Sequence, residues 1–390
     1  MKSNSQFNAE VFKKYNNMIE EKNDKFFFRH VYKKNYSDIS KIAIFFVVFL
    51  MIFIGTIYAT IYVYNRKQTK LTPTYTETIG DTNMNNIWVG TFQLVWNEFI
   101  EQRVKDNVEF ENENNNLVSE LNKKSFTKEM LSEEDYYIKV DKTTPELKEE
   151  IRKDINEKFD IQTSSLLENI NFNNNEKFES YTLYSVLFKQ FNFINPFDKL
   201  KYAEPFSGSK EKIQYFGINN ASDEILNENV EVLFYNNKNE FAVKLKTKEK
   251  EEVLLYRTSD NKSFSDLYSQ LLEKSLLYEG EKEFNKDDEL KIPYINIDTL
   301  INYGELCGKV IKNTGGLYIQ NALQNVKFSL NEKGGNLISE AGLKDIYLSV
   351  SENSRYFYFN DRFVLFLKEE NKEQPYFALR VNNTDILVGE

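Results

Sequence analysis

An uncharged run of 23 residues, from Ile42 to Tyr64, constrains the fold of this chain more than any other feature. A helix of about 20 apolar residues is long enough to span the hydrocarbon core of a bilayer. The run begins too far from Met1, and continues for too long, to be a cleaved secretion signal. Its flanks are polar, whereas a buried core helix needs protein on every side. We therefore expect residues 42–64 to form a transmembrane helix.

The cations on either side of this run predict its orientation. Six Lys or Arg residues lie among the twenty residues that end at Lys41, and three follow the run closely, Arg66, Lys67 and Lys70. Cytoplasmic flanks carry the excess of Lys and Arg. We therefore expect a single-pass protein of the cell membrane, with a cytoplasmic basic tail (1–41), a polar linker (65–86) and an extracytoplasmic domain (87–390).

The expected outer part of the chain is strongly acidic. Residues 1–70 hold 12 of the 50 basic and 5 of the 60 acidic residues, which leaves 38 against 55 for the rest of the chain. A net charge near −17 argues against nucleic acid or anionic lipid head groups as partners of this part. Asn and Lys are abundant whereas Gly and Pro are few. That composition is typical of AT-rich genomes, and we expect a bacterial source.

The residue inventory excludes several kinds of catalytic site. The single histidine, His30, lies in the expected cytoplasmic tail, so the outer domain has no imidazole for a catalytic triad or a His-ligated metal site. Cys307 is the single cysteine, so no intrachain disulfide forms, and a buried thiol is expected. Phosphate-binding glycine motifs are absent, and the acidic runs are typical of solvated turns. The sequence predicts no enzyme, no cofactor, no metal site and no small-molecule substrate.

Helical patterns dominate the first part of the outer domain and strand patterns the last part. Helices are expected at residues 145–159, 263–278 and 300–311. The first of them is expected to have Thr144 as its N-cap and Pro145 at its first position. Strands are expected at residues 181–188, 230–235, 241–245, 253–256, 292–297 and 317–330, and between 356 and 381. This order indicates an α+β fold with large mixed or antiparallel sheets.

A long segment without periodicity separates two of these strands. The strand that ends at Leu330 is followed by Asn331-Glu332-Lys333-Gly334-Gly335, and aromatic-rich strands resume only at Tyr356. A loop of about twenty residues inside a compact domain is uncommon and is usually functional or disordered. We therefore expect the function of the outer domain to involve this loop.

Five strings, in the same order along residues 145–387, resemble serpins, the serine protease inhibitor superfamily. They are Val186–Asp198 with its Asn-Pro-Phe, Lys291–Ile297, Asn321–Gly334 (NALQNVKFSLNEKG), Phe359–Leu367, and Leu379–Asn383. The chain departs from the family at Phe193 (Trp in the family), Lys333 (Glu), Arg362 (Pro) and Leu379 (Gly). The segment before Tyr181 is shorter than the helical half of a serpin, so some family helices are expected to be missing.

The resemblance implies that residues 335–354 correspond to the reactive-centre loop. In inhibitory serpins a protease cuts this loop, and the hinge half inserts into the central sheet as a new strand. Family spacing places the cut at Leu348-Ser349 when counted from Gly334, and about three residues later when counted from Phe359. The hinge consists of Gly334, Gly335, Asn336, Leu337, Ile338, Ser339, Glu340 and Ala341. The family has small residues there, whereas Leu337 and Ile338 are bulky and Glu340 is costly to bury.

These observations favour a membrane-anchored serpin-like protein that binds another protein and does not trap proteases. One alternative is a membrane-tethered protease inhibitor that acts through Leu348 or a neighbour. Another is a structural or assembly protein of the envelope. The expected partners are the membrane, through a single span, and a protease or another envelope protein.

Overall fold

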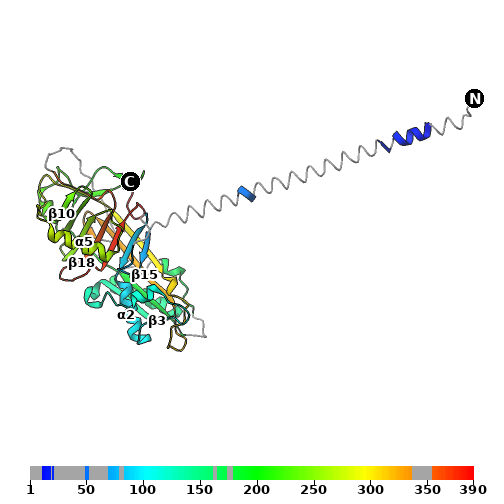
Figure 1. Cartoon of the computed structure of the whole chain (residues 1–390), viewed down its shortest axis with the longest axis horizontal. Coiled ribbons are helices and arrows are strands. Elements are labelled where there is room, and N and C mark those ends of the chain that lie inside the picture. The colour runs from blue at the N-terminus through cyan, green and yellow to red at the C-terminus, as the bar shows by residue number, and fades with distance from the viewer. Residues whose placement is uncertain are drawn as a thin grey trace, which may run out of the picture. The chain divides into compact units, whose positions relative to one another are not determined.

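The computed structural model describes residues 11–18, 20–21, 49–51, 69–78, 83–160, 165–173, 179–335 and 354–390 (Figure 1). The chain divides into two compact units, residues 1–67 and 68–390. In the first unit, residues 11–18 and 49–51 are helical. No helix within the described residues is long and apolar enough to cross a membrane. Apart from residues 49–51, the expected span at 42–64 lies outside the described residues and stays a prediction.

The longest sheet of the second unit has the strand order β1-β2-β19-β18-β12-β11-β10. Its neighbours are antiparallel except β1 and β2, which are parallel. β1 lies within the segment that the sequence analysis assigns to a linker, so the packed domain begins before Ile87. The strands are β1 (Thr69–Thr72), β2 (Asn85–Val89), β10 (Val230–Asn237), β11 (Glu240–Lys246), β12 (Glu251–Arg257), β18 (Phe363–Glu369) and β19 (Phe377–Val381).

A second sheet has the order β3-β4-β15-β16-β5, with β14 also paired to β15. β4 and β15 lie parallel, in a register that runs from Tyr318 opposite Ser180 to Val326 opposite Leu187. The other pairs in this sheet are antiparallel. The strands are β3 (Tyr136–Lys142), β4 (Ser180–Leu187), β5 (Phe191–Asn192), β14 (Ile295–Asn302), β15 (Tyr318–Asn331) and β16 (Gly334–Gly335).

A third sheet has the order β17-β13-β9-β6, and β7 pairs with β8 in a small ribbon. β13 lies parallel to β17 and antiparallel to β9. The strands are β6 (Asp198–Lys199), β7 (Glu204–Pro205), β8 (Lys212–Ile213), β9 (Tyr215–Ile218), β13 (Glu289–Pro293) and β17 (Tyr356–Tyr358).

Helices cover the sheets at both ends of the domain. Figure 1 shows α2 near β3, and α5 near β10 and β18. The α-helices are α2 (Thr91–Phe99), α3 (Asn116–Leu121), α4 (Pro145–Phe159) and α5 (Phe264–Leu277). The shorter helical turns are η1 (Ile100–Val104), η2 (Lys128–Met130), η3 (Glu133–Asp135), η4 (Ser165–Asn169), η5 (Glu224–Asn229) and η6 (Gly304–Leu306).

Most expected elements are confirmed, including the start of α4. The Thr144 side chain accepts a hydrogen bond from the Leu147 amide, and Pro145 occupies the first helical turn. The mixed sheets agree with the expected α+β class. The helix expected at residues 300–311 is wrong, because β14 continues to Asn302 and only η6 is helical there. Pairing with β15 from Leu330 to Leu323 extends this strand beyond the point where the apolar spacing suggested a helix.

Two apolar clusters flank the β4–β15 pair. On one side, Tyr184, Val186 and Leu323 pack with the α4 residues Leu147, Ile151 and Ile155. On the other side, Tyr181, Leu183 and Ala322 pack with α2 residues that include Phe92 and Phe99. Alternate residues of a strand point to opposite faces of its sheet. The centre of this sheet is therefore buried on both faces.

Candidate functional site

The candidate site consists of the described residues on either side of residues 336–353. β16 lies at the first end, next to β15, and Arg355 and β17 lie at the second end. Both ends are held by hydrogen bonds and by buried charges. The geometry of the first end decides whether the following residues could enter the sheet.

β16 is wedged between two strands. Gly334 and Gly335 pair with β15 at Asn331 and Leu330 on one side, and with β5 at Asn192 and Phe191 on the other. The Phe193 amide donates to the Lys333 carbonyl oxygen at 2.8 Å, and the Phe197 amide donates to the Glu332 carbonyl oxygen at 2.8 Å. The first two hinge residues are therefore already part of the sheet.

Both hinge positions require glycine. Gly334 has a φ of +144°, and a Cβ there would lie 2.1 Å from the carbonyl oxygen of Phe191. A Cβ on Gly335 would lie 2.5 Å from the ring of the same phenylalanine. Backbone cannot move out of the way as easily as a flexible side chain, and positive φ is strained for other residues. The sheet admits β16 because these two residues have no side chain.

A buried ion pair lies under this turn. The Glu332 Oε1 and Lys199 Nζ atoms are 3.3 Å apart, and neither side chain is more than 9% exposed. Burial, together with the nearby charge of Glu332, raises the pKa of the Tyr294 hydroxyl. Breaking a buried pair leaves an uncompensated charge, which is strongly destabilising. The pair therefore helps to hold the turn against β6.

A larger charge cluster lies at the break between β4 and β5. The Lys189 ammonium is 2.6 Å from Glu251 Oε1 and 3.4 Å from Glu369 Oε1, and it also contacts Asp135. Glu251 and Glu369 are directly opposite each other on β12 and β18. Like charges placed opposite destabilise a sheet. Lys189 therefore offsets this repulsion, and it does so between β4 and β5, near the position of β16 in the second sheet.

The cluster has one cation for three carboxylates, and burial is the largest influence on the pKa of each member. Burial raises the pKa of Glu251 and also that of Asp135, although Lys189 opposes both shifts. Burial acts in the same direction on Glu369, but hydrogen bonds from the Ser132 amide and hydroxyl lower its pKa overall. The Tyr376 hydroxyl donates to Glu251 Oε2 at 2.7 Å. Burial opposes the charge of Lys189, but the carboxylates raise its pKa.

The second end of the site is held by Arg355. Its amide, Nε and Nη2 donate to the buried Asp288 carboxylate at 3.0, 3.1 and 2.7 Å. Its Nη1 and Nη2 also donate to the carbonyl oxygens of Glu281 and Glu283. A bidentate arginine–carboxylate pair combines charge with fixed geometry. The chain is therefore fixed where it enters β17.

The serpin-like strings fall on neighbouring elements. Asn321–Gly334 covers β15 and the turn into β16, and Val186–Asp198 covers the end of β4 and β5 in the same sheet. Phe359–Leu367 and Leu379–Asn383 fall on β18 and β19, which pair antiparallel. Lys291–Ile297 spans the end of β13 and the start of β14. β15, which leads into residues 336–353, therefore pairs with β4, whose last residues belong to another of these strings.

Among the expected site residues, Gly334 and Gly335 lie in β16. The other hinge residues (Asn336, Leu337, Ile338, Ser339, Glu340 and Ala341) and the expected cleavage pair Leu348 and Ser349 lie outside the described residues. Sequence analysis missed the Lys189 cluster and the Arg355–Asp288 pair. Their members are far apart in the sequence and belong to ordinary-looking polar runs. The one available signal was the position of Lys189 directly after an apolar strand.

No family model matches this chain, and no curated protein sequence matches it. Among solved structures it is similar to Serpin48 of the insect Tenebrio molitor, with 13% identity and a TM-score of 0.45, over 77% of this chain and 92% of that one. It is similar to thyroxine-binding globulin with 15% identity and a TM-score of 0.44, over 60% of this chain and 64% of that one, which is less than two thirds of the globulin. A serpin from the trematode Schistosoma haematobium matches with 12% identity and a TM-score of 0.40, over 60% of this chain and 62% of that one. These structures are serpins, the family that the sequence resembles.

Replacing either hinge glycine should destabilise the domain. We expect Gly334→Ala and Gly335→Ala each to lower the free energy of unfolding by on the order of 2 kcal/mol, because the new methyl group meets Phe191. Gly304→Ala is the matched control, since a Cβ there meets no atom within 4 Å. Chemical denaturation measures all three. Equal midpoints for the three variants would contradict the tight contact at β16.

Removing the cation of the Lys189 cluster and removing one of its carboxylates should have opposite effects on the free energy of unfolding at neutral pH. Lys189→Met should lower the free energy of unfolding by about 3–5 kcal/mol at neutral pH, because three carboxylates then lack a counter-charge. The raised pKa of Glu251 means that its stabilising contribution is present below its ordinary pKa and is lost as the pH rises through the raised value. The stability of Glu251→Gln relative to the wild type should therefore increase between about pH 4 and pH 7.

Denaturation at several pH values tests both expectations. Lys153→Met on α4 is the control for loss of a lysine, since its side chain is 72% exposed. A Lys189→Met variant as stable as this control would contradict the compensating role of Lys189. A Glu251→Gln variant whose relative stability falls as the pH rises would contradict the raised pKa.

Proposed function

We propose that the second unit, residues 68–390, forms a divergent serpin-like domain that binds another protein and does not trap proteases. We further propose that residues 42–64 hold it at the outer face of the cell membrane. The main support for the non-inhibitory role is the position of β16. The first two hinge residues, both glycines, lie in the sheet in tight contact with β5, and the bulky residues Leu337 and Ile338 follow in the sequence.

The register of β16 predicts what further insertion would require. β15 pairs Leu330 with Gly335, and β5 pairs Phe191 with Gly335, in antiparallel ladders. Continued in this register, an inserted strand would place Glu340 opposite Asn325 and Val186. Those two residues now pair directly with each other. Insertion would therefore have to separate the β4–β15 pair along its length.

The same register brings Glu340 to an apolar face. Residues that are directly opposite on neighbouring strands point to the same face of a sheet. Val186 belongs to the cluster that α4 covers, together with Leu323 and Ile151. An ionised carboxylate without a partner is very costly in such a place. This cost supports a loop that stays out of the sheet, where it would be available for recognition by a partner.

A protease assay with a hinge variant tests this proposal. The full chain in detergent is treated with chymotrypsin-like and subtilisin-like proteases. We expect cleavage within residues 336–353 with no denaturant-resistant complex and no marked rise in the melting temperature. The variant Leu337→Ala/Ile338→Ala/Glu340→Ala removes the expected barrier, so after cleavage its melting temperature should rise above that of the cleaved wild type.

The wild type itself provides the decisive result. A covalent complex, or a sharp rise in the melting temperature of the cleaved wild type, would contradict the non-inhibitory proposal and support the alternative of a tethered inhibitor. Failure of the triple variant to respond would show that hinge composition is not the barrier.

Single-cysteine labelling tests the membrane topology. Burial raises the pKa of the Cys307 thiol to about 11, so this thiol should react slowly, and it is replaced by Ser for the experiment. An impermeant maleimide applied to intact cells should label Lys210→Cys in the domain and leave Lys13→Cys in the tail unlabelled. After the cells are opened, both should react. Labelling of the tail in intact cells would reverse the proposed orientation.

A further inference from the structure

A cavity of about 380 Å³ lies beside the second end of the candidate site. It is bordered by the turn between β10 and β11, by the last residue of β12, and by β17 and the residues that follow it. Its lining is polar and aromatic, and the charged residues among those that line it are both cations. The lining residues are Lys238, Asn239, Arg257, Tyr356, Tyr358 and Asn360.

Arg257 is buried at the wall of this cavity, and its carboxylate partner is partly exposed. Its residue exposure is 8%, and its Nη1 donates to the Tyr358 carbonyl oxygen and, at 2.7 Å, to Asn360 Oδ1. The nearest acidic partner is Asp361, whose Oδ2 is 3.8 Å from Nη2. The Asp361 side chain is 49% exposed and also accepts a hydrogen bond from the Ser207 hydroxyl. Burial lowers the pKa of Arg257, as expected for a charge with incomplete compensation.

Other acidic groups near the cavity already have partners. Glu289 accepts a hydrogen bond from the Tyr358 hydroxyl. Glu204 is 2.6 Å from the ammonium of Lys291, and that ammonium lies over the Tyr358 ring, 4.4 Å from its centre. The residues that line the cavity include two cations and no acid, although the residues after position 70 carry a large net negative charge.

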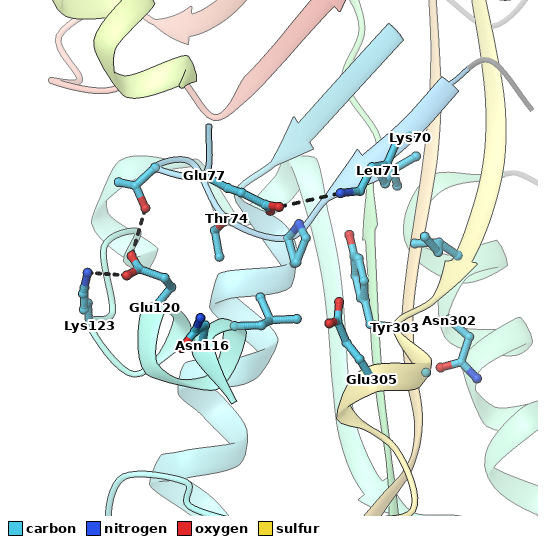
Figure 2. A pocket seen from close by; sticks show the side chains of 15 residues that line it. Lys70, Leu71, Thr74, Glu77, Asn116, Glu120, Lys123, Asn302, Tyr303 and Glu305 are labelled. Atoms are coloured by element: carbon cyan, nitrogen blue, oxygen red, sulfur yellow. Dashed lines mark hydrogen bonds and ion pairs between the residues drawn. The ribbon is translucent and has the colours of Figure 1, made fainter. Parts of the chain in front are cut away.

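A larger cavity of about 780 Å³ has a different electrostatic character (Figure 2). Its lysines are paired within the cavity wall, Lys70 with Glu77 at 3.6 Å and Lys123 with Glu120 at 2.6 Å. Figure 2 shows Glu305 beside Tyr303 on the other side of the space. Its charges largely compensate each other and favour no particular ligand. The smaller cavity, with two cations and no acid in its lining, is the more selective one.

We propose that the cavity at Arg257 and Lys238 binds a carboxylate or another small oxyanion. Arginine presents a planar pair of donors that matches an oxyanion, and Lys238 adds a second charge from an exposed turn. The tyrosines at positions 356 and 358 and the two asparagines supply aromatic walls and further hydrogen-bonding groups. The volume is near the lower end of the range for ligand pockets, about 300–1,000 Å³. The anion is either a free small molecule or the acidic side chain of a partner protein.

This site is independent of the hinge and goes beyond the proposed protein-binding role. Arg257 holds the backbone of Tyr358 and the side chain of Asn360, which follow residues 336–353 in the chain. An anion in the cavity, beside the guanidinium, would increase the local compensation of charge. Binding should therefore stabilise the folded domain by an amount that grows with the logarithm of the ligand concentration once this exceeds Kd.

The test uses the full chain in detergent at constant ionic strength. Inorganic phosphate, succinate and the blocked peptide N-acetyl-Gly-Glu-Gly-amide are titrated separately, and the melting temperature and the heat of binding are recorded. With at least one of these ligands we expect a saturable heat of binding and a melting temperature that rises with the logarithm of the ligand concentration. Lys238→Glu should weaken the binding at least 10-fold, whereas Lys210→Glu makes the same charge change at another exposed site and should bind normally.

A second variant covers the buried residue. Arg257→Lys keeps the charge but loses the planar donor pair, and it should also weaken binding while circular dichroism confirms that it folds. Tighter binding of the peptide than of succinate assigns the anion to a partner's acidic side chain, and the reverse order assigns it to a free small molecule. The absence of saturable binding, or equal binding by the wild type and Lys238→Glu, would overturn the proposal. None of these outcomes depends on the protease assay.

Discussion

The parallel pairing of β4 with β15 is the interaction on which the rest of this domain depends. β4 follows α4 and η4 in the chain, and β15 leads to the glycine turn. The pair is buried on both faces. The first end of the candidate site lies at one end of this pair, whereas Arg355 precedes β17, which belongs to the third sheet. Lys189 follows the end of β4, and Glu332 follows the end of β15. The two charge networks lie beyond the last paired residues of β4 and β15, where backbone hydrogen bonds no longer join these two strands.

The strands and the capped helices of this domain could be predicted from short sequence patterns. β4, β10, β11 and β12 follow from apolar and aromatic runs between polar turns, and α4 follows from Thr144-Pro145. Residues 300–311 could not, because pairing with a long neighbouring strand overrode their local helical spacing. β1 was hidden for the same reason, since a short polar strand acquires its structure from β2.

The position of the candidate site could be predicted from the sequence, but the contacts that form it could not. Glycines after a long strand, followed by an aperiodic segment, indicated the position of the hinge. The reason that glycine is required is a contact with Phe191, which is far away in the sequence. The same holds for Lys189, whose carboxylate partners come from three separate elements. Single-sequence patterns describe neighbours along the chain, whereas these sites are made by neighbours across sheets.

The hydrogen bonds that hold Arg355 determine what a cut in the preceding residues would do to the protein. The strands that follow Arg355 pair with strands from earlier in the sequence. β17 pairs with β13 in one sheet, and β18 lies between β12 and β19 in another. A backbone nick anywhere in residues 336–353 would thus divide the polypeptide without dividing the molecule. The two fragments would separate on a denaturing gel and remain one particle in native buffer. The domain would then behave as a heterodimer made from a single gene product, with the shorter subunit supplying inner strands of the longer one's sheet.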